Sequence, residues 1–110
     1  HAHSIWELVR HIAGWETVFR RRLEGERITE PEAGDFPASD EVSERAWRQA
    51  LAELDASHEK LLGVLAGLST AKLDERVAGA EYTVGFLLRG LIRHNVYHAG
   101  QIALLGKAFV

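Results

Sequence analysis

Apolar residues recur at alternating spacings of three and four along three long segments of the chain. This period places the apolar side chains of each segment on one face of an α-helix. The pattern predicts helices over residues 4–24, 42–67 and 84–107, with no stretch of strand-like alternation of useful length. The first helix presents Ile5, Leu8, Ile12, Trp15, Phe19 and Leu23. The chain is therefore expected to form one all-α domain over residues 1–110.

Histidines interrupt the apolar stripes of the other two predicted helices. The stripe of the helix over 42–67 comprises Trp47, Leu51, Leu54, His58, Leu61, Leu65 and Leu68. The stripe of the helix over 84–107 comprises Val84, Leu87, Leu88, Leu91, His94, Asn95, His98, Ile102 and Leu105. Imidazoles are thus expected to face the interior beside leucine.

Local signals mark where two of these helices begin, and a long link separates the first two. Ser4 and Glu7 form the S-x-x-E pattern of a capping box, and Thr83 can cap the last helix. The link over residues 26–40 holds both prolines. Fifteen residues can span at most ~50 Å, whereas a 22-residue helix is about 33 Å long. The link can therefore cross the length of a bundle, and the helices it joins need not be antiparallel.

Composition narrows the possible chemistry. The 110 residues contain no cysteine, which excludes disulfides, a thiolate zinc site and a cysteine nucleophile. Acidic and basic residues are interspersed at a net charge of −3, so a nucleic-acid partner is not expected. No apolar run approaches the ~20 residues of a membrane helix and no signal peptide is visible, so a cytoplasmic protein without a membrane partner is predicted. Any bound metal would have imidazole or carboxylate ligands.

His94 and His98 form the first candidate metal site. Residues four apart on a helix lie one above the other on one face, so their imidazoles can converge on a single ion. Burying two unpaired imidazoles would cost several kcal/mol, on the order of other unsatisfied polar groups. Their place in an apolar stripe therefore favours a shared ligand over two solvated side chains.

The residues alone leave the third ligand open. His11 lies at the edge of the stripe of the first helix, and His58 occupies a full stripe position on the second. His1 and His3 precede the capping box and receive no ligand role. The zinc-protease motif H-E-x-x-H is absent, which removes that class of enzyme.

Two segments resemble a known family. "HSIWELVRHIAGWE" and "YTVGFLLRGLIRHNVYHAGQIALL", with the spacing between them, are similar to the DinB/YfiT-like superfamily of metal-dependent enzymes. The resemblance implies a four-helix bundle with a long crossover link and a divalent metal held by three histidines. Carried onto this chain, the ligands are His11, His94 and His98, and His58 matches no ligand. The helix over 4–24 corresponds to the second helix of the family. We therefore expect that the first helix of the family is missing from the given chain, or that the protein closes its bundle by oligomerising.

The resemblance also suggests a chemistry. Three imidazoles leave at least one coordination position open, as in catalytic zinc sites. Family members with known activity include S-transferases and isomerases that use low-molecular-weight bacterial thiols. We therefore expect a homodimeric metal-dependent transferase or hydrolase that acts on a small molecule, with a thiol as possible cosubstrate. Zinc or nickel is the expected ion, with iron or manganese as alternatives.

Two further side chains are candidates for orienting the ligands. Glu7 lies one turn before His11, and Gln101 lies three residues after His98. Either can bond the free nitrogen of an imidazole, although Glu7 has the capping box as a competing role. The alternative function is a non-catalytic metal-binding module for stress response or sensing. A purely structural helical module would leave the histidines pointing apart.

Overall fold

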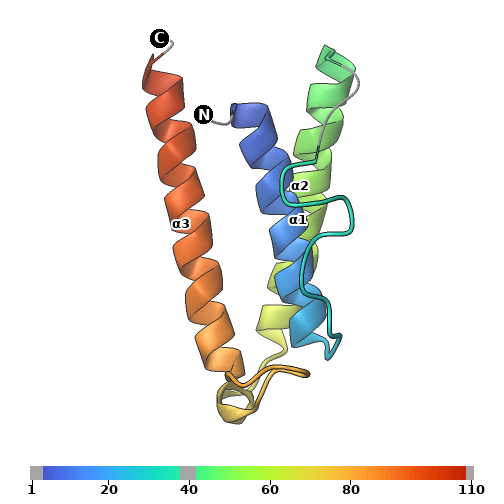
Figure 1. Cartoon of the computed structure of the whole chain (residues 1–110), viewed down its shortest axis with the longest axis vertical. Coiled ribbons are helices and arrows are strands. Elements are labelled where there is room, and N and C mark those ends of the chain that lie inside the picture. Colours follow the sequence, from blue (N-terminus) through green and yellow to red (C-terminus); the bar gives the residue numbers. More distant parts are fainter. Residues whose placement is uncertain (1–3, 38–41, 109–110) are drawn as a thin grey trace.

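The computed structural model describes residues 4–37 and 42–108, and within these ranges the chain is all-α (Figure 1). The helices are α1 (Ile5–Leu23), α2 (Glu44–Ala66), the short 3₁₀ helix η1 (Thr70–Asp74) and α3 (Val84–Ala108). The prediction of an all-α fold is confirmed, and the ends of the α-helices lie within two residues of the expected ones. His1 and His3 lie outside the described residues.

The link between α1 and α2 crosses the length of the molecule, so the two helices run in the same direction (Figure 1). Trp6 near the start of α1 contacts Trp47 near the start of α2, with ring centroids 5.7 Å apart. Ser57 in the middle of α2 reaches Glu16 in the middle of α1. α3 runs in the opposite direction, and α1 packs against both other helices. None of the described helices is both long and apolar enough to span a membrane.

Side-chain caps begin each α-helix. Ser4 and Glu7 complete the capping box, each side chain bonding the backbone N–H of the other residue. Ser43 caps α2 by accepting from the N–H of Ala46, and Thr83 accepts from the N–H of Phe86 at the start of α3. These bonds satisfy amides that have no partner within a helix.

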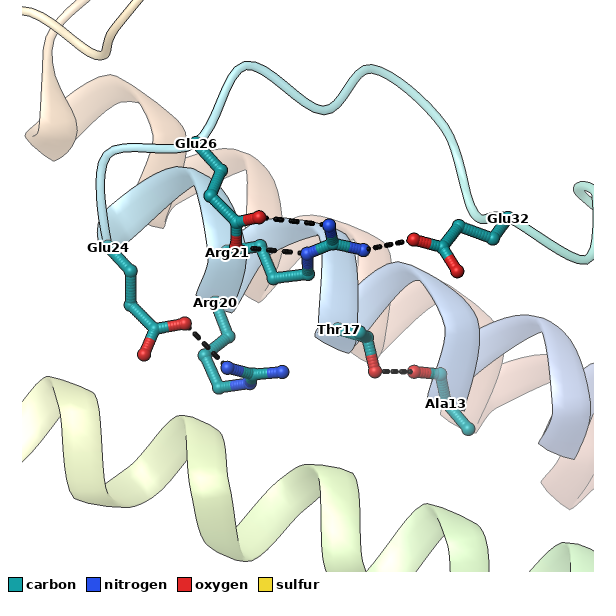
Figure 2. Close-up of polar contacts among 7 residues, drawn as sticks. All are labelled: Ala13, Thr17, Arg20, Arg21, Glu24, Glu26 and Glu32. Atoms are coloured by element: carbon teal, nitrogen blue, oxygen red, sulfur yellow. Dashed lines mark hydrogen bonds and ion pairs between the residues drawn. The ribbon is translucent and has the colours of Figure 1, made fainter.

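The arginine run near the end of α1 holds the first part of the link in place. Arg21 binds the carboxylates of Glu26 and Glu32, and Arg20 pairs with Glu24 (Figure 2). The hydrogen bonds from Arg21 lower the pKa of Glu26 below its usual value. These cations lie at the carboxyl end of the helix, where they also suit the dipole. These ion pairs thus fasten the start of the link to α1 where the chain reverses direction.

Arg22 joins the link to the segment before α3. Its guanidinium donates to the carbonyls of Ile28 and Thr29 and to the hydroxyl of Tyr82. One planar side chain therefore ties the end of α1 and the start of the link to Tyr82, 60 residues further along the chain.

The buried face of α2 differs from the predicted stripe. Leu51 is 38% exposed and the side chain of His58 is 51% exposed, whereas Ala50 and Ser57 are buried. At these two places the residue before the predicted one is buried, whereas Leu61 of the predicted stripe is buried as expected. The prediction that His58 faces the interior is therefore wrong.

The main apolar cluster lies at the end of the molecule near η1. It joins residues from all three α-helices and the connection before α3, namely Leu23, Leu61, Val77, Val84, Leu87 and Leu91. The stripe of α3 continues into His98, which is buried, while its outer face exposes Ile92, Val96 and Leu104.

Two adjacent leucines of α2 offer a matched test of this packing. Leu61 is 2% exposed within the main cluster, whereas Leu62 is 46% exposed. We expect Leu61→Ala to lower the free energy of unfolding by about 2–5 kcal/mol, since it leaves a cavity. Leu62→Ala should change it by about 0.5 kcal/mol or less. Urea denaturation followed by circular dichroism measures both, and equal losses would contradict this orientation of α2.

Candidate metal centre

Three histidines from two helices converge on one point. Nε2 of His11, on α1, lies 3.0 Å from Nε2 of His98 and 3.2 Å from Nε2 of His94, both on α3. His11 and His98 are buried, and His94 is half-buried. One ligand atom from each of the three lies within 4.8 Å of the other two, and within the described residues no other His, Asp or Glu group forms such a cluster.

The outward nitrogen of His11 is held by the end of the link. Nδ1 lies 2.7 Å from the backbone carbonyl of Asp35 and 3.2 Å from its carboxylate. Because both atoms only accept hydrogen bonds, Nδ1 carries the proton and Nε2 presents its lone pair to the cluster. The ring of Phe36 stacks on the imidazole, with centroids 4.1 Å apart and planes 6° from parallel.

Two glycines allow the link to reach His11. A Cβ at Gly14 would lie 3.3 Å from the side chain of Pro31, so glycine lets the buried proline pack directly on α1. Gly34 closes a turn onto the carbonyl of Pro31 with φ +94, a conformation that glycine adopts without strain. Asp35 follows at once, and its carboxylate also accepts from Nε1 of Trp15 at 2.6 Å.

The two histidines of α3 find partners on their own helix. Nδ1 of His98 bonds the amide oxygen of Gln101, and Nδ1 of His94 lies 3.3 Å from the amide oxygen of Asn95. In each case an acceptor outside the cluster holds the proton of Nδ1, which leaves Nε2 as the inward atom. The pKa of His94 is lowered by burial and by its two histidine neighbours, and the bond to Asn95 opposes this only in part.

The convergent nitrogens fit a shared cation. Neutral imidazoles that carry their protons on Nδ1 cannot hydrogen-bond to one another through Nε2, so their lone pairs face each other without a donor. Nitrogens that share one divalent ion at ~2.1 Å lie about 3.0 to 3.4 Å apart. The separations of 3.0 and 3.2 Å fall in this range.

The other predicted site residues take different places. Gln101 contacts His98, as its spacing suggested. Glu7 forms the capping box, and the outward nitrogen of His11 meets Asp35 instead. His58 stands apart from the cluster, with Nδ1 3.2 Å from the carboxylate of Glu16.

Three residues to which the sequence analysis gave no role in holding the ligands connect to the histidines, Glu16 through Asn95. Asp35 lies in the irregular link, where no periodicity points to it. Asn95 belongs to the predicted stripe, but spacing alone did not require a role. Glu16 lies four residues after Ile12 and three before Phe19, so a charged side chain at an apolar stripe position was a signal that could have revealed it.

A comparison with models of known protein families identifies a match. The model of a protein family described as the DinB superfamily matches residues 1–102. No curated protein and no solved structure shows significant similarity to the chain.

The lowered pKa of His94 links stability to pH. The folded chain takes up a proton at His94 less readily than the unfolded chain, whose imidazole titrates near pH 6.5. The contribution of this group to stability is therefore complete above about pH 6.5 and is lost as pH falls through the lower pKa of the folded state. With a chelator present, we expect His94→Gln to reduce the fall in unfolding free energy between about pH 7.5 and 5.5. An unchanged pH dependence in urea denaturation would contradict this assignment.

Proposed function

The chain belongs to the DinB superfamily, and from this premise we propose that it binds a divalent metal ion through Nε2 of His11, His94 and His98 and acts as a metal-dependent enzyme. One observation is the main support for this proposal. Each of the three imidazoles has an acceptor beside its outward nitrogen. The inward nitrogens lie 3.0 and 3.2 Å apart in two pairs, and with the protons on Nδ1 they face each other as acceptors. Such a set of lone pairs is complementary to a cation.

Held by these three imidazoles, a divalent ion would supply Lewis acidity and would leave a position open to a small molecule. The protein's own residues position the imidazoles and limit the access of water. Phe36 covers one face of His11, and the rings of Trp15 and Phe19 lie near His94, each 6.2 Å from it between centroids. Tyr97 packs its ring edge-on against His98 and is 65% exposed.

For the reaction, we propose a thiol-dependent S-transfer to a small electrophile, with hydrolysis of a small molecule as the second possibility. The support is the family membership together with a donor set of three imidazoles. Imidazole suits zinc, nickel and iron better than calcium or magnesium, and zinc and nickel also accept thiolate sulfur. Zinc or nickel is therefore the proposed ion, with iron or manganese as alternatives.

A non-catalytic sensor or stress-response module is the alternative function. It would use the same three ligands but would not turn over a substrate. A homodimer and a cytoplasmic location stay predictions; the exposed apolar side chains of Ile92, Val96 and Leu104 on α3 are compatible with a second copy covering them.

Metal content tests the proposed centre directly. We expect the purified protein to hold close to one equivalent of Zn²⁺ or Ni²⁺ after incubation with the ion and removal of excess. The double variant His94→Ala/His98→Ala should hold less than about a tenth of that amount, because one imidazole cannot retain the ion. His58→Ala, which removes a histidine outside the cluster, should bind as the wild type does. Equal and negligible content in all three proteins would refute the metal site.

Activity distinguishes an enzyme from a sensor. We expect the metal-loaded protein to accelerate the consumption of a model electrophile by a low-molecular-weight thiol, and His11→Ala to lower kcat/KM by about 100-fold or more while its helical circular dichroism persists. The same rate in His11→Ala would argue against metal-assisted catalysis. A wild type that binds metal tightly but gives no thiol-dependent rate would favour the alternative function.

A further inference from the structure

Glu16 is the most deeply buried acidic group described in the chain, and it contacts residues of two other helices. Only 3% of its side chain is exposed. Oε2 accepts from the hydroxyl of Ser57 at 3.3 Å, and Oε1 lies 3.2 Å from Nδ1 of His58, both on α2. Oε1 also accepts from Nδ2 of Asn95 on α3 at 3.1 Å. Since burying a carboxylate is costly, a merely structural bridge could use neutral groups at lower cost.

The carboxylate fixes the direction of the hydrogen bonds that lead to the histidine cluster. A carboxylate offers only acceptors, so Asn95 must turn Nδ2 toward Glu16. Its Oδ1 then faces Nδ1 of His94, 3.3 Å away, and can only accept there. His94 is thereby held with its proton on Nδ1 and its lone pair on Nε2.

We propose that Glu16 is a positioning residue for His94 and acts through Asn95 by selecting the imidazole tautomer that can bind metal. The inference rests on the proposed metal site and adds to it a residue that touches none of the three ligands. Without the carboxylate, the amide of Asn95 can turn over and present Nδ2 to His94. The imidazole then carries its proton on Nε2, which points into the cluster and blocks coordination.

Replacement of Glu16 by glutamine, its neutral isostere, tests whether the carboxylate sets the direction of these hydrogen bonds. In Glu16→Gln the amide can either accept from Asn95 or donate to it, so neither orientation of Asn95 is enforced. We expect two-bond ¹H–¹⁵N spectra of the metal-free protein at about pH 8 to show His94 in the Nδ1–H form in the wild type. In Glu16→Gln the spectra should show a mixture of both tautomers.

A double variant should restore the tautomer with the hydrogen bond reversed. In Glu16→Gln/Asn95→Asp the amide at position 16 donates to the carboxylate at position 95. The second oxygen of that carboxylate accepts from Nδ1 of His94. We expect the Nδ1–H form to return. General damage to the core would not be repaired by a second substitution at this place, so recovery distinguishes positioning from packing.

Zn²⁺ affinity, measured by competition with a chromophoric chelator, should follow the tautomer. We expect Glu16→Gln to bind Zn²⁺ about 10-fold or more weakly, and the double variant to recover most of this loss. Ser57→Ala is the matched control, because it removes a buried partner of Glu16 that does not lead to His94. It should keep both the tautomer and the affinity of the wild type.

A further variant covers the case in which Glu16→Gln does not fold. Asn95→Ala leaves Glu16 with its two partners on α2, and the half-buried position tolerates a small side chain. It should give the same mixture of tautomers and the same loss of affinity.

The outcomes separate this inference from the proposed function. An unchanged His94 tautomer in Glu16→Gln or Asn95→Ala would overturn the inference, as would an equal loss of affinity in Ser57→Ala. If those results came with tight Zn²⁺ binding by the wild type, the metal site would stand. A wild type that binds no Zn²⁺ but shows the tautomer change would refute the metal site and support the control of His94 by Glu16.

Discussion

The meeting of three imidazole lone pairs is the constraint on which the rest of this structure depends. Nε2 of His11 approaches the same atom of His94 and His98 to within 3.2 Å, a distance that facing lone pairs tolerate poorly unless a cation lies among them. Each ring must therefore be held from its outer side. The partners are a backbone carbonyl for His11 and side-chain amides for the other two. Much of the polar structure between α1, α3 and the link serves to hold them.

The parallel arrangement of α1 and α2 follows from the same need. A short turn would have placed α2 antiparallel to α1 and left the outer nitrogen of His11 without the carbonyl of Asp35. The long link instead runs back along α1 (Figure 1). Arg21 holds its start, and Pro31 packs on Gly14 before Asp35 and Phe36 reach the imidazole. The long link between α1 and α2 thus supplies one wall of the site.

Periodicity could predict the helices and the inward direction of His94 and His98, because both depend on local backbone geometry. It could not choose between His11 and His58. Both Ser57 and His58 reach Glu16, but the orientation of α2 buries Ser57 and leaves the side chain of His58 51% exposed. The role of Asp35 could not be predicted from the sequence, because an irregular link has no periodicity. The role of Glu16 could have been predicted, because a carboxylate on the apolar face of a helix already indicates a buried polar network.

The position of the histidines also makes them part of the fold. On α3 the buried apolar residues end at Leu91, and His98 is the next buried residue of that helix among those whose burial is described. Beyond the main apolar cluster, α3 therefore meets α1 largely through imidazoles and through the bond from Asn95 to Glu16. Hydrogen bonds of this kind contribute only about 1 kcal/mol each.

A ligand that binds the folded chain and not the unfolded one adds to its stability. An ion shared by His11, His94 and His98 would thus do more than supply chemistry, because it would join α1 to α3 beyond the last buried apolar residue of α3.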